Sequence, residues 1–284
     1  MIPIDDLLRF VREDAPWGDV TSETVVPDVA CRAVIQAKDT GIVAGLEEAR
    51  ALFEHFEVVV RQRSTDGRSV ARGAVLLEIE GRARTILLLE RTVLNIIGRM
   101  SGIATRTQEA VEAVRAISPD VRIAATRKTA PGLRMLDKKA VILGGGDPHR
   151  YCLSDMVLIK DNHLTLVPLP EAIRKAKEQS RYRAVEVEVE TARDAVEAAV
   201  AGADIILLDN MTPSAVRETV GTLAARGLRE GVTLEVSGGV AGDDLAGYAA
   251  TGIDIISMGA LTHTVRNFDV SLDVLKGAGT VRLS

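Results

Sequence analysis

The second half of the sequence repeats one pattern, and this repeat constrains the fold more than any other feature. A short run of apolar, β-branched residues is followed by a turn and then by a stretch with the spacing of an amphipathic helix. Strands that alternate with helices form parallel sheets, and continuous apolar runs are typical of strands covered on both faces. The repeat therefore predicts a (β/α) barrel or a doubly wound sheet. The predicted strands are Val121–Thr126, Met156–Lys160, Ala184–Val189, Asp204–Leu208, Val232–Val236 and Asp254–Ser257.

Helices are expected between these strands. Thr191 and Thr212 stand where helix N-caps would fall, because a threonine hydroxyl can accept a hydrogen bond from the first turn. The predicted helices are Pro170–Glu178, Thr191–Ala201, Pro213–Arg226 and Asp243–Thr251.

The first hundred residues follow a different pattern, typical of an antiparallel or mixed α+β layer. Turn signals occur at Thr40-Gly41 and Asp66-Gly67. Gly98 and Gly102 are expected to break the long helical stretch that precedes the repeat. The expected elements are strands Cys31–Lys38 and Val70–Ile79, a helix over Leu46–Phe56 and a helical region over Thr85–Ile117.

These patterns predict two domains in the 284-residue chain. Residues 1–110 form an N-terminal α+β sandwich-like domain. Residues 111–267 form the α/β domain, and residues 268–284 are expected to pack back on the first domain.

Composition excludes several classes of protein. With 46% hydrophobic and 26% charged residues the chain is globular, and a net charge of −5 argues against a general nucleic-acid binder. Cys31 and Cys152 have neither disulfide-framework nor metal-site spacing, which favours a reducing compartment. The N-terminus lacks a basic region followed by an apolar one, and no apolar run is long enough to span a membrane. We therefore expect a cytoplasmic protein with no membrane partner.

Charged and small residues stand at the carboxyl ends of the predicted strands. In a (β/α) barrel these ends converge on the active site, which makes a shared site more plausible than six unrelated surface residues. The residues are Arg127 and Lys128, Lys160, Glu188, Asp209, the Ser237-Gly238-Gly239 turn and the Ser257-Met258-Gly259 turn.

Two features of this edge suit a phosphorylated substrate. The glycine turns after the last two strands would let main-chain N–H groups approach a phosphate, although tight turns alone would also explain them. Glu188 and Asp209 are oxygen ligands on successive strands and could hold Mg²⁺. Ordinary strand alternation is the competing explanation, because Glu186 and Glu190 share the face of Glu188.

The segment 127–163 concentrates positive charge within an acidic protein. Seven lysines and arginines stand there against four aspartates, and His149-Arg150 follows the flexible Gly144-Gly145-Gly146 turn. Arginine matches carboxylate and phosphate groups with two parallel N–H donors, so the segment indicates an anionic substrate. For Arg134 and Lys138 a solvated helix face is an equally good explanation.

Seven ordered motifs resemble the quinolinate phosphoribosyltransferase family. They are TRKTAPGLR, GGGDPHR, LIKDNH, VEVEVE, LLDNM, SGG and SMGALTH. The resemblance implies an N-terminal sandwich-like domain and an incomplete α/β barrel. It also implies transfer of a phosphoribosyl group from 5-phosphoribosyl-1-pyrophosphate to quinolinate, with Mg²⁺, giving nicotinate mononucleotide, pyrophosphate and CO₂ in NAD biosynthesis.

The resemblance also implies roles for individual residues. The quinolinate pocket would consist of Arg127, Lys128, His149, Arg150 and Lys160, and Arg91 would reach it from the neighbouring subunit of a homodimer. The carboxylates near ribose and metal would be Glu188 and Asp209, which with Lys128 and Lys160 make up the catalytic set. The 5-phosphate loops would be Ser237, Gly238 and Gly239 with Ser257, Gly259 and Ala260.

Three positions depart from the family pattern, and three other functions stay open. Ala125, Pro148 and Lys139 stand where other residue types are common, which leaves the fine geometry of the pocket undetermined. The alternatives are a paralogue linked to molybdate transport, a nicotinate phosphoribosyltransferase and a non-catalytic phosphate-binding barrel. The retained Lys160-Asp161-Asn162-His163 stretch argues against the first of these, because such paralogues tend to lose it.

Overall fold

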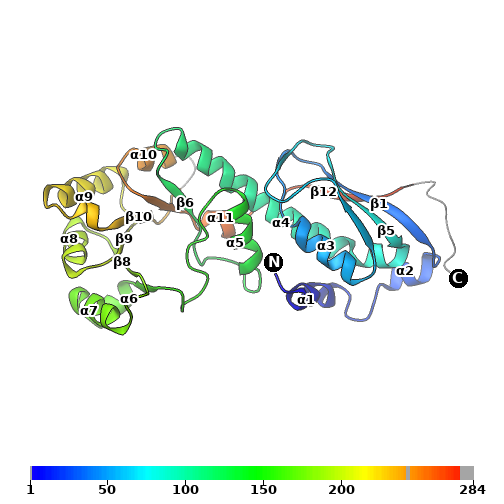
Figure 1. Ribbon diagram of the computed structural model, residues 1–284, viewed down its shortest axis with the longest axis horizontal. Helices are drawn as coiled ribbons and strands as arrows, with labels where there is room; N and C mark the ends of the chain where they lie inside the picture. The colour runs from blue at the N-terminus through cyan, green and yellow to red at the C-terminus, as the bar shows by residue number, and fades with distance from the viewer. Residues whose placement is uncertain (1, 241–243, 276–284) are drawn as a thin grey trace. The chain divides into compact units, whose positions relative to one another are not determined.

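The computed structural model describes residues 2–240 and 244–275, which form two compact units (Figure 1). Within these residues the first unit runs to Arg106 and adds Met135–Gly144 and the segment from Val265 onward. The second unit contains Thr107–Arg134 and Gly145–Thr264. The division differs from the expected one at 110/111, most clearly because Met135–Gly144 lies in the first unit. Part of the expected tail, residues 276–284, and the start of the expected helix at Asp243 lie outside the described residues.

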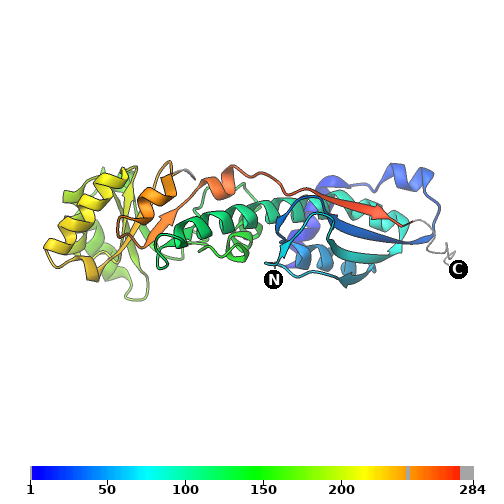
Figure 2. The same ribbon diagram turned by 90° about the horizontal axis from the view of Figure 1, so that it is seen from above.

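The first unit is built on an antiparallel sheet with strand order β12-β1-β5-β3. The strand from the tail, β12, pairs with β1 over Ala33↔Val274 to Ala37↔Val270, and the two run side by side in Figure 2. A second, two-stranded ladder joins β2 to β4. The strands are β1 (Ala30–Ala37), β2 (Gly41–Ile42), β3 (Val59–Gln62), β4 (Ser69–Val70), β5 (Val75–Arg82) and β12 (Val270–Val274), and the helices are α1 (Ile4–Asp14), α2 (Val20–Val25) and α3 (Leu46–His55).

The sequence placed one strand over Val70–Ile79, and this prediction is wrong. The structure has two strands there, β4 and β5, separated by a turn in which Gly73 has φ +90°. Such a conformation favours glycine, and the turn directs the two strands to different ladders.

The long helix α4 (Ala83–Arg115) is continuous, so the breaks expected at Gly98 and Gly102 do not occur. Instead, these glycines let another part of the chain come close to the helix. A Cβ added at Gly102 would lie 2.1 Å from the carbonyl oxygen of Arg266, and one at Gly98 would lie 3.0 Å from that of Phe268. The glycines therefore serve packing of the C-terminal segment against the helix.

The helix α5 (Arg134–Leu143) belongs almost entirely to the first unit because its charged residues are paired there. Asp137 is fully buried and accepts two hydrogen bonds from the Arg99 guanidinium, at 2.7 and 2.9 Å. Lys139 contacts Glu47 and Glu48 of α3. Lys138 is also buried, so the solvated-face explanation for this residue is wrong.

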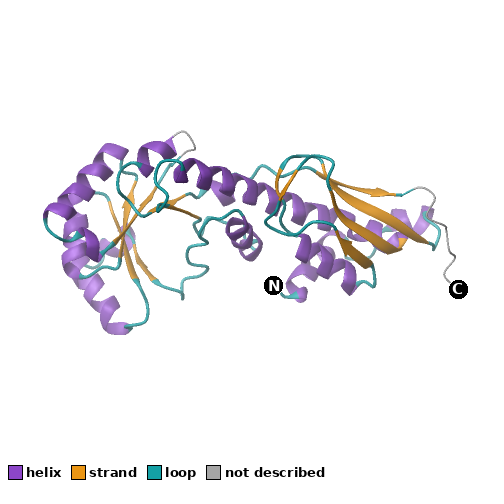
Figure 3. Ribbon diagram, turned by 45° about the horizontal axis from the view of Figure 1, so that its top comes forward, coloured by secondary structure: helices purple, strands orange, loops and turns teal. Residues whose placement is uncertain are grey.

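The second unit contains six parallel strands in the order β6-β11-β10-β9-β8-β7. Helices α7, α8 and α9 lie on one face of this sheet (Figure 3). No pairing joins β6 to β7 within the described residues, so the arrangement is an incomplete (β/α) barrel, and the predicted fold class is confirmed. The strands are β6 (Arg122–Ala124), β7 (Val157–Ile159), β8 (Val185–Val189), β9 (Ile205–Asp209), β10 (Thr233–Ser237) and β11 (Ile255–Ser257).

Helices α8 and α9 begin where the sequence placed them. Thr191 accepts a hydrogen bond from the Asp194 N–H at α8, and Thr212 accepts one from the Ala215 N–H at α9. Both predicted N-caps are confirmed. The elements are α6 (Asp161–Leu164), α7 (Leu169–Gln179), α8 (Ala192–Ala201), α9 (Pro213–Ala225), a 3₁₀ turn (Arg229–Gly231), α10 (Leu245–Ala249) and α11 (Ala260–His263).

Apolar residues of the strands and of the inner helix faces form one core in this unit. Val187, Ile206, Leu208 and Val236 are fully buried within it. The polar residues that interrupt these strands are therefore exceptions within an apolar sheet. Among the described helices, none is both long and apolar enough to cross a membrane.

Candidate active site

A cavity of about 300 Å³ lies at the carboxyl edge of the parallel sheet. Strand ends that are far apart in the sequence supply its walls, as expected for a barrel of this type. A larger hollow of about 1000 Å³ lies beside α7 and the start of β8, but it is more open and lies away from the strand ends that carry the predicted residues. The smaller cavity is lined by Thr126, Arg127, Lys128, His149, Arg150, Leu158, Lys160, Glu188, Leu207, Asp209, Glu235 and Ser237.

Two guanidinium groups in this cavity are available to bind an anion. The Nε atom of Arg127 is buried and has no hydrogen-bond partner among the described residues. Burial and the nearby Arg127 charge lower the pKa of Arg150, although an arginine stays charged at neutral pH. Buried donors are rarely left unsatisfied in proteins, so a carboxylate ligand would complete this arrangement.

A lysine and a carboxylate pair across neighbouring strands at the same edge. The Lys160 ammonium forms an ion pair with Glu188, which is 12% exposed at its side chain. The main-chain N–H of Lys160 donates to Nδ1 of His163 at 2.9 Å, which ties the start of α6 to the end of β7. The ion pair restrains both side chains at the cavity wall.

Asp209 ends β9 and turns toward the same cavity. Its Oδ2 atom accepts a hydrogen bond of 2.6 Å from the side-chain amide of Asn210. Asn210 has φ +53°, and its N–H donates to the Ser237 carbonyl at 2.9 Å. Asparagine tolerates this left-handed conformation better than most residues, so it suits the turn that carries Asp209.

A buried acidic pair contacts a histidine at the wall of the cavity. The Nε2 atom of His149 lies 3.5 Å from Oε2 of Glu186 and 3.5 Å from Oε1 of Glu235. Burial lowers the pKa of His149, but the two carboxylates outweigh it and raise the value to about 9. Burial raises the pKa of Glu186. Sequence reasoning did not select Glu235, although a glutamate inside an apolar strand was a signal for it.

The glycine turn after β10 has the conformation that close approach to a ligand requires. Gly238 and Gly239 have φ of +92° and +60°. A Cβ at Gly238 would lie 2.3 Å from Oδ1 of Asn210. Any larger residue there would collide with the Asp209–Asn210 turn, so the glycine is required by packing as well as by φ.

The second expected phosphate turn is arranged differently. The Ser257 hydroxyl donates to Glu235 and is buried. Gly259 and Ala260 begin the short α11, and a Cβ at Gly259 would lie 3.0 Å from Cδ of Lys128. Arg91 lies on α4 in the first unit and is exposed. The roles that the sequence suggested for these residues stay predictions.

The donor set near Glu188 and Asp209 suits Mg²⁺. Magnesium is commonly held by one or two carboxylates together with substrate phosphate oxygens, and two carboxylates line this cavity. Glu188 is already paired with Lys160, so Asp209 is the less neutralised of the two. These residues fit the ion, and its binding stays a proposal.

The fold and the cavity define an α/β-barrel enzyme with a cation-lined site for anionic substrates. The family model described as the quinolinate phosphoribosyl transferase N-terminal domain matches residues 19–101, and that of the C-terminal domain matches residues 103–273. The chain belongs to the quinolinate phosphoribosyl transferase family, as the motifs predicted.

Individual relatives agree over nearly the whole length. The chain is 42% identical to a probable nicotinate-nucleotide pyrophosphorylase (carboxylating) of Methanothermobacter thermautotrophicus, over 95% of this chain and 98% of that one. It is 37% identical to the Homo sapiens nicotinate-nucleotide pyrophosphorylase (carboxylating), over 93% and 88%. The solved nicotinate-nucleotide pyrophosphorylase of Francisella tularensis has a TM-score of 0.89 and 34% identity, with 97% and 98% coverage.

Proposed function

We propose that the chain transfers the phosphoribosyl group of 5-phosphoribosyl-1-pyrophosphate to quinolinate and releases pyrophosphate and CO₂. The observation that carries this is the cavity in which Arg127, Lys128, Arg150 and Lys160 converge, with one buried Arg127 N–H unsatisfied. Quinolinate carries two adjacent carboxylates, and such a dianion matches a pocket of fixed cations.

Both described cysteines are free thiols, as is usual for proteins of a reducing compartment, and we place the activity in the cytoplasm.

Positioning and electrostatics account for the first step. Fixed cations hold the dicarboxylate so that the ring nitrogen faces C1 of the ribose. Because both reactants are bound in this orientation, the step is effectively unimolecular, which lowers its entropic cost. The C–O bond to pyrophosphate breaks as the C1–N bond forms. Glu188 and Asp209 at the rim of the cavity stabilise the positive charge that develops on the ribose.

The second step needs no protein nucleophile. Once the ring nitrogen carries the ribosyl group it is cationic and can accept the electron pair of the C2–carboxylate bond. CO₂ leaves, and C2 takes a proton from solvent. Mg²⁺ held by Glu188 and Asp209 would neutralise charge on the pyrophosphate group.

The test is an assay of the purified protein with 5-phosphoribosyl-1-pyrophosphate and Mg²⁺, in which nicotinate mononucleotide formation is followed with quinolinate and, in parallel, with nicotinate. We expect turnover of quinolinate and not of nicotinate. Turnover of nicotinate would instead identify the enzyme alternative without decarboxylation. Absence of nicotinate mononucleotide with either substrate, from a folded protein, would favour the paralogue or the non-catalytic barrel. Omission of Mg²⁺ tests the metal proposal separately.

We also propose a homodimer in which Arg91 of one subunit serves the site of the other. The exposed position of this arginine on α4 leaves its side chain available to a second copy of the chain. Mixing Arg91→Ala subunits with Arg150→Ala subunits should then restore activity, because some mixed dimers contain one intact site. Failure of mixed dimers to gain activity would show that each site is built within one chain.

A further inference from the structure

His149 uses both of its ring nitrogens within the chain. The Nδ1 atom accepts a hydrogen bond of 2.7 Å from the main-chain N–H of Arg150. The Nε2 atom faces one oxygen of Glu186 and one of Glu235. The side chain is only 12% exposed, and the residue adopts φ +54°, which few residue types other than glycine tolerate. The ring is therefore held from two sides at the wall of the cavity.

These contacts determine where the ring carries its hydrogen. An atom that accepts a hydrogen bond must offer an electron pair, so the contact of Nδ1 with the Arg150 N–H belongs to the neutral His149 ring. Nε2, which faces the two carboxylates, carries a hydrogen in this neutral ring and also in the charged ring that the raised pKa favours. The ligand atoms of His149, Glu186 and Glu235 lie within 4.8 Å of one another, close enough to hold a metal ion. A protonated Nε2 has no electron pair for a metal, so the contact with Arg150 argues against that use of the cluster.

Of the two carboxylates, Glu186 has little else to bind. Glu186 is fully buried, and neither of its oxygens has a hydrogen-bond partner among the described residues apart from the longer contact with His149. Glu235 is 1% exposed and receives the Ser257 hydroxyl. Burying a carboxylate costs free energy unless the group is paired. Two buried glutamates on two strands of this site therefore indicate a function for the pair.

We propose that Glu186 and Glu235 are positioning residues for the quinolinate subsite. Coming from β8 and β10, they fix the His149 ring between them. The ring in turn fixes the main chain of Arg150, whose guanidinium lines the cavity beside Arg127. His149 thus acts at the cavity wall and through Arg150. Glu235 also accepts the Ser257 hydroxyl, so only Glu186 is expected to act on the quinolinate subsite alone. The inference rests on the proposed function.

The test removes the acceptors and then restores them. Glu186→Leu and Glu235→Leu should each raise the KM for quinolinate about tenfold or more, as loss of a buried hydrogen-bond partner would. In Glu186→Leu the KM for 5-phosphoribosyl-1-pyrophosphate should change less than about twofold, within what independent sites tolerate. Glu235→Leu also removes the acceptor of the Ser257 hydroxyl, so both KM values should rise in that variant. Glu186→Gln and Glu235→Gln keep a carbonyl acceptor and should recover most of the loss. Glu190→Gln, an exposed change just after the same strand, is the matched control and should behave as wild type.

A coupling experiment keeps the inference testable if a leucine variant folds poorly. His149→Asn keeps an acceptor near Arg150 and tolerates positive φ, but it is too short to reach both carboxylates. In the His149→Asn background, Glu186→Ala and Glu235→Ala, which remove the acceptor without adding bulk, should therefore have no further effect on the KM for quinolinate, although each should raise it in the wild-type background. Additive effects in the double variants would overturn the proposed chain of contacts.

The remaining outcomes separate this inference from the proposed function. A wild-type protein that does not turn over quinolinate refutes the proposed function. If the wild type is active, an unchanged quinolinate KM in both leucine variants overturns the inference. Equal rises of both KM values in Glu186→Leu, without rescue by Glu186→Gln, would also overturn it and indicate a general structural role. Stoichiometric metal in the wild type that is lost in the Glu235→Gln variant would assign the cluster to a metal instead.

Discussion

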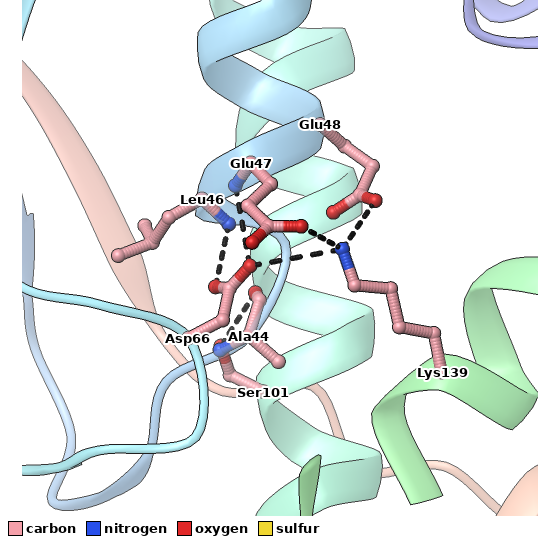
Figure 4. A network of polar contacts seen from close by, with 7 residues as sticks. All are labelled: Ala44, Leu46, Glu47, Glu48, Asp66, Ser101 and Lys139. Carbon is pink, nitrogen blue, oxygen red and sulfur yellow. Dashed lines mark hydrogen bonds and ion pairs between the residues drawn. The ribbon is translucent and has the colours of Figure 1, made fainter. Parts of the chain in front are cut away.

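The Nζ atom of Lys139 lies 2.7 Å from Oε1 of Glu48, a carboxylate that is almost completely buried. It lies 2.7 Å from Glu47 as well and 3.9 Å from Asp66, and Figure 4 shows the ammonium group between the three acids. Asp66 also accepts the main-chain N–H groups of Leu46 and Glu47 at the start of α3. Lys139 is thus matched by an acidic pocket in the first unit.

We predict that Lys139→Met lowers the free energy of unfolding by about 3 kcal/mol, because it leaves the buried Glu48 carboxylate without its cation. Chemical denaturation measures the change. Arg50→Met, which removes an exposed partner of Glu54 on the same helix α3, is the matched control and should cost less than about 0.5 kcal/mol. Equal losses in the two variants would mean that the Lys139 cluster contributes no more than a surface pair.

The Lys139→Met effect should depend on pH in a defined window. The hydrogen bond and charge of Lys139 lower the pKa of Glu47, so this contribution is complete above the ordinary value of 4.5 and is lost as pH falls through the lowered pKa. Burial acts against the charge of Lys139, but Glu47 and Glu48 outweigh it and raise the lysine pKa. That contribution is complete below 10.5 and is lost as pH rises through the raised pKa. The difference from wild type should be largest between pH 4.5 and 10.5, and a difference that grows outside this window would contradict the assignment.

Gly102→Ala should destabilise the protein although alanine is the better helix former. The added Cβ would lie 2.1 Å from the Arg266 carbonyl, and relief of such a collision costs about 1–3 kcal/mol. Gly221→Ala in α9 is the matched control, because no atom lies within 4 Å of the added Cβ. That change should stabilise by about 0.5–1 kcal/mol. Thermal unfolding of both variants measures the contrast, and stabilisation by both would show that the C-terminal segment does not press on α4.

The local patterns of the sequence were sufficient to locate the strands and main helices of the second unit, but not those of the first. Apolar periodicity and the caps at Thr191 and Thr212 located the parallel strands and helices, because the burial of each element leaves its own pattern. Gly102 was assigned the wrong role because its reason lies at Arg266, which is distant in sequence. Tertiary contacts of this kind leave no periodic pattern.

The candidate site shows the same limit. Arg127, Lys160 and Asp209 were predictable because strand ends converge in a barrel, and they do line one cavity. Glu235 could not be predicted as a site residue, because its role depends on contact with the His149 ring. His149 lies in a loop and has a left-handed main-chain conformation, which the sequence pattern does not reveal. A buried charge can be recognised in a sequence, but its partner cannot.

Lys160→Met should reduce kcat/KM for quinolinate at least about 100-fold, and it should also lower the melting temperature because Glu188 loses its cation. The variant removes a cation from the cavity and leaves the partly buried Glu188 unpaired. Lys175→Met, whose exposed partner is Glu171 on α7, is the control and should leave kcat/KM unchanged. Steady-state kinetics at saturating 5-phosphoribosyl-1-pyrophosphate gives both values. Near-normal turnover by Lys160→Met would remove this lysine from the proposed site.

Gly238→Ala and Gly239→Ala should separate a packing requirement from a conformational one. Both residues have positive φ, which costs an alanine about 1–2 kcal/mol. Only at Gly238 would the added Cβ also collide, at 2.3 Å from the Asn210 side chain and 2.8 Å from its main-chain nitrogen. That collision displaces the turn which carries Asp209 and Ser237. Gly238→Ala should therefore raise the KM for 5-phosphoribosyl-1-pyrophosphate well above the value for Gly239→Ala. Steady-state kinetics of the two variants gives the two KM values, and their melting temperatures report the conformational cost that both variants share. Equal KM values would show that the turn does not position the sugar-phosphate substrate.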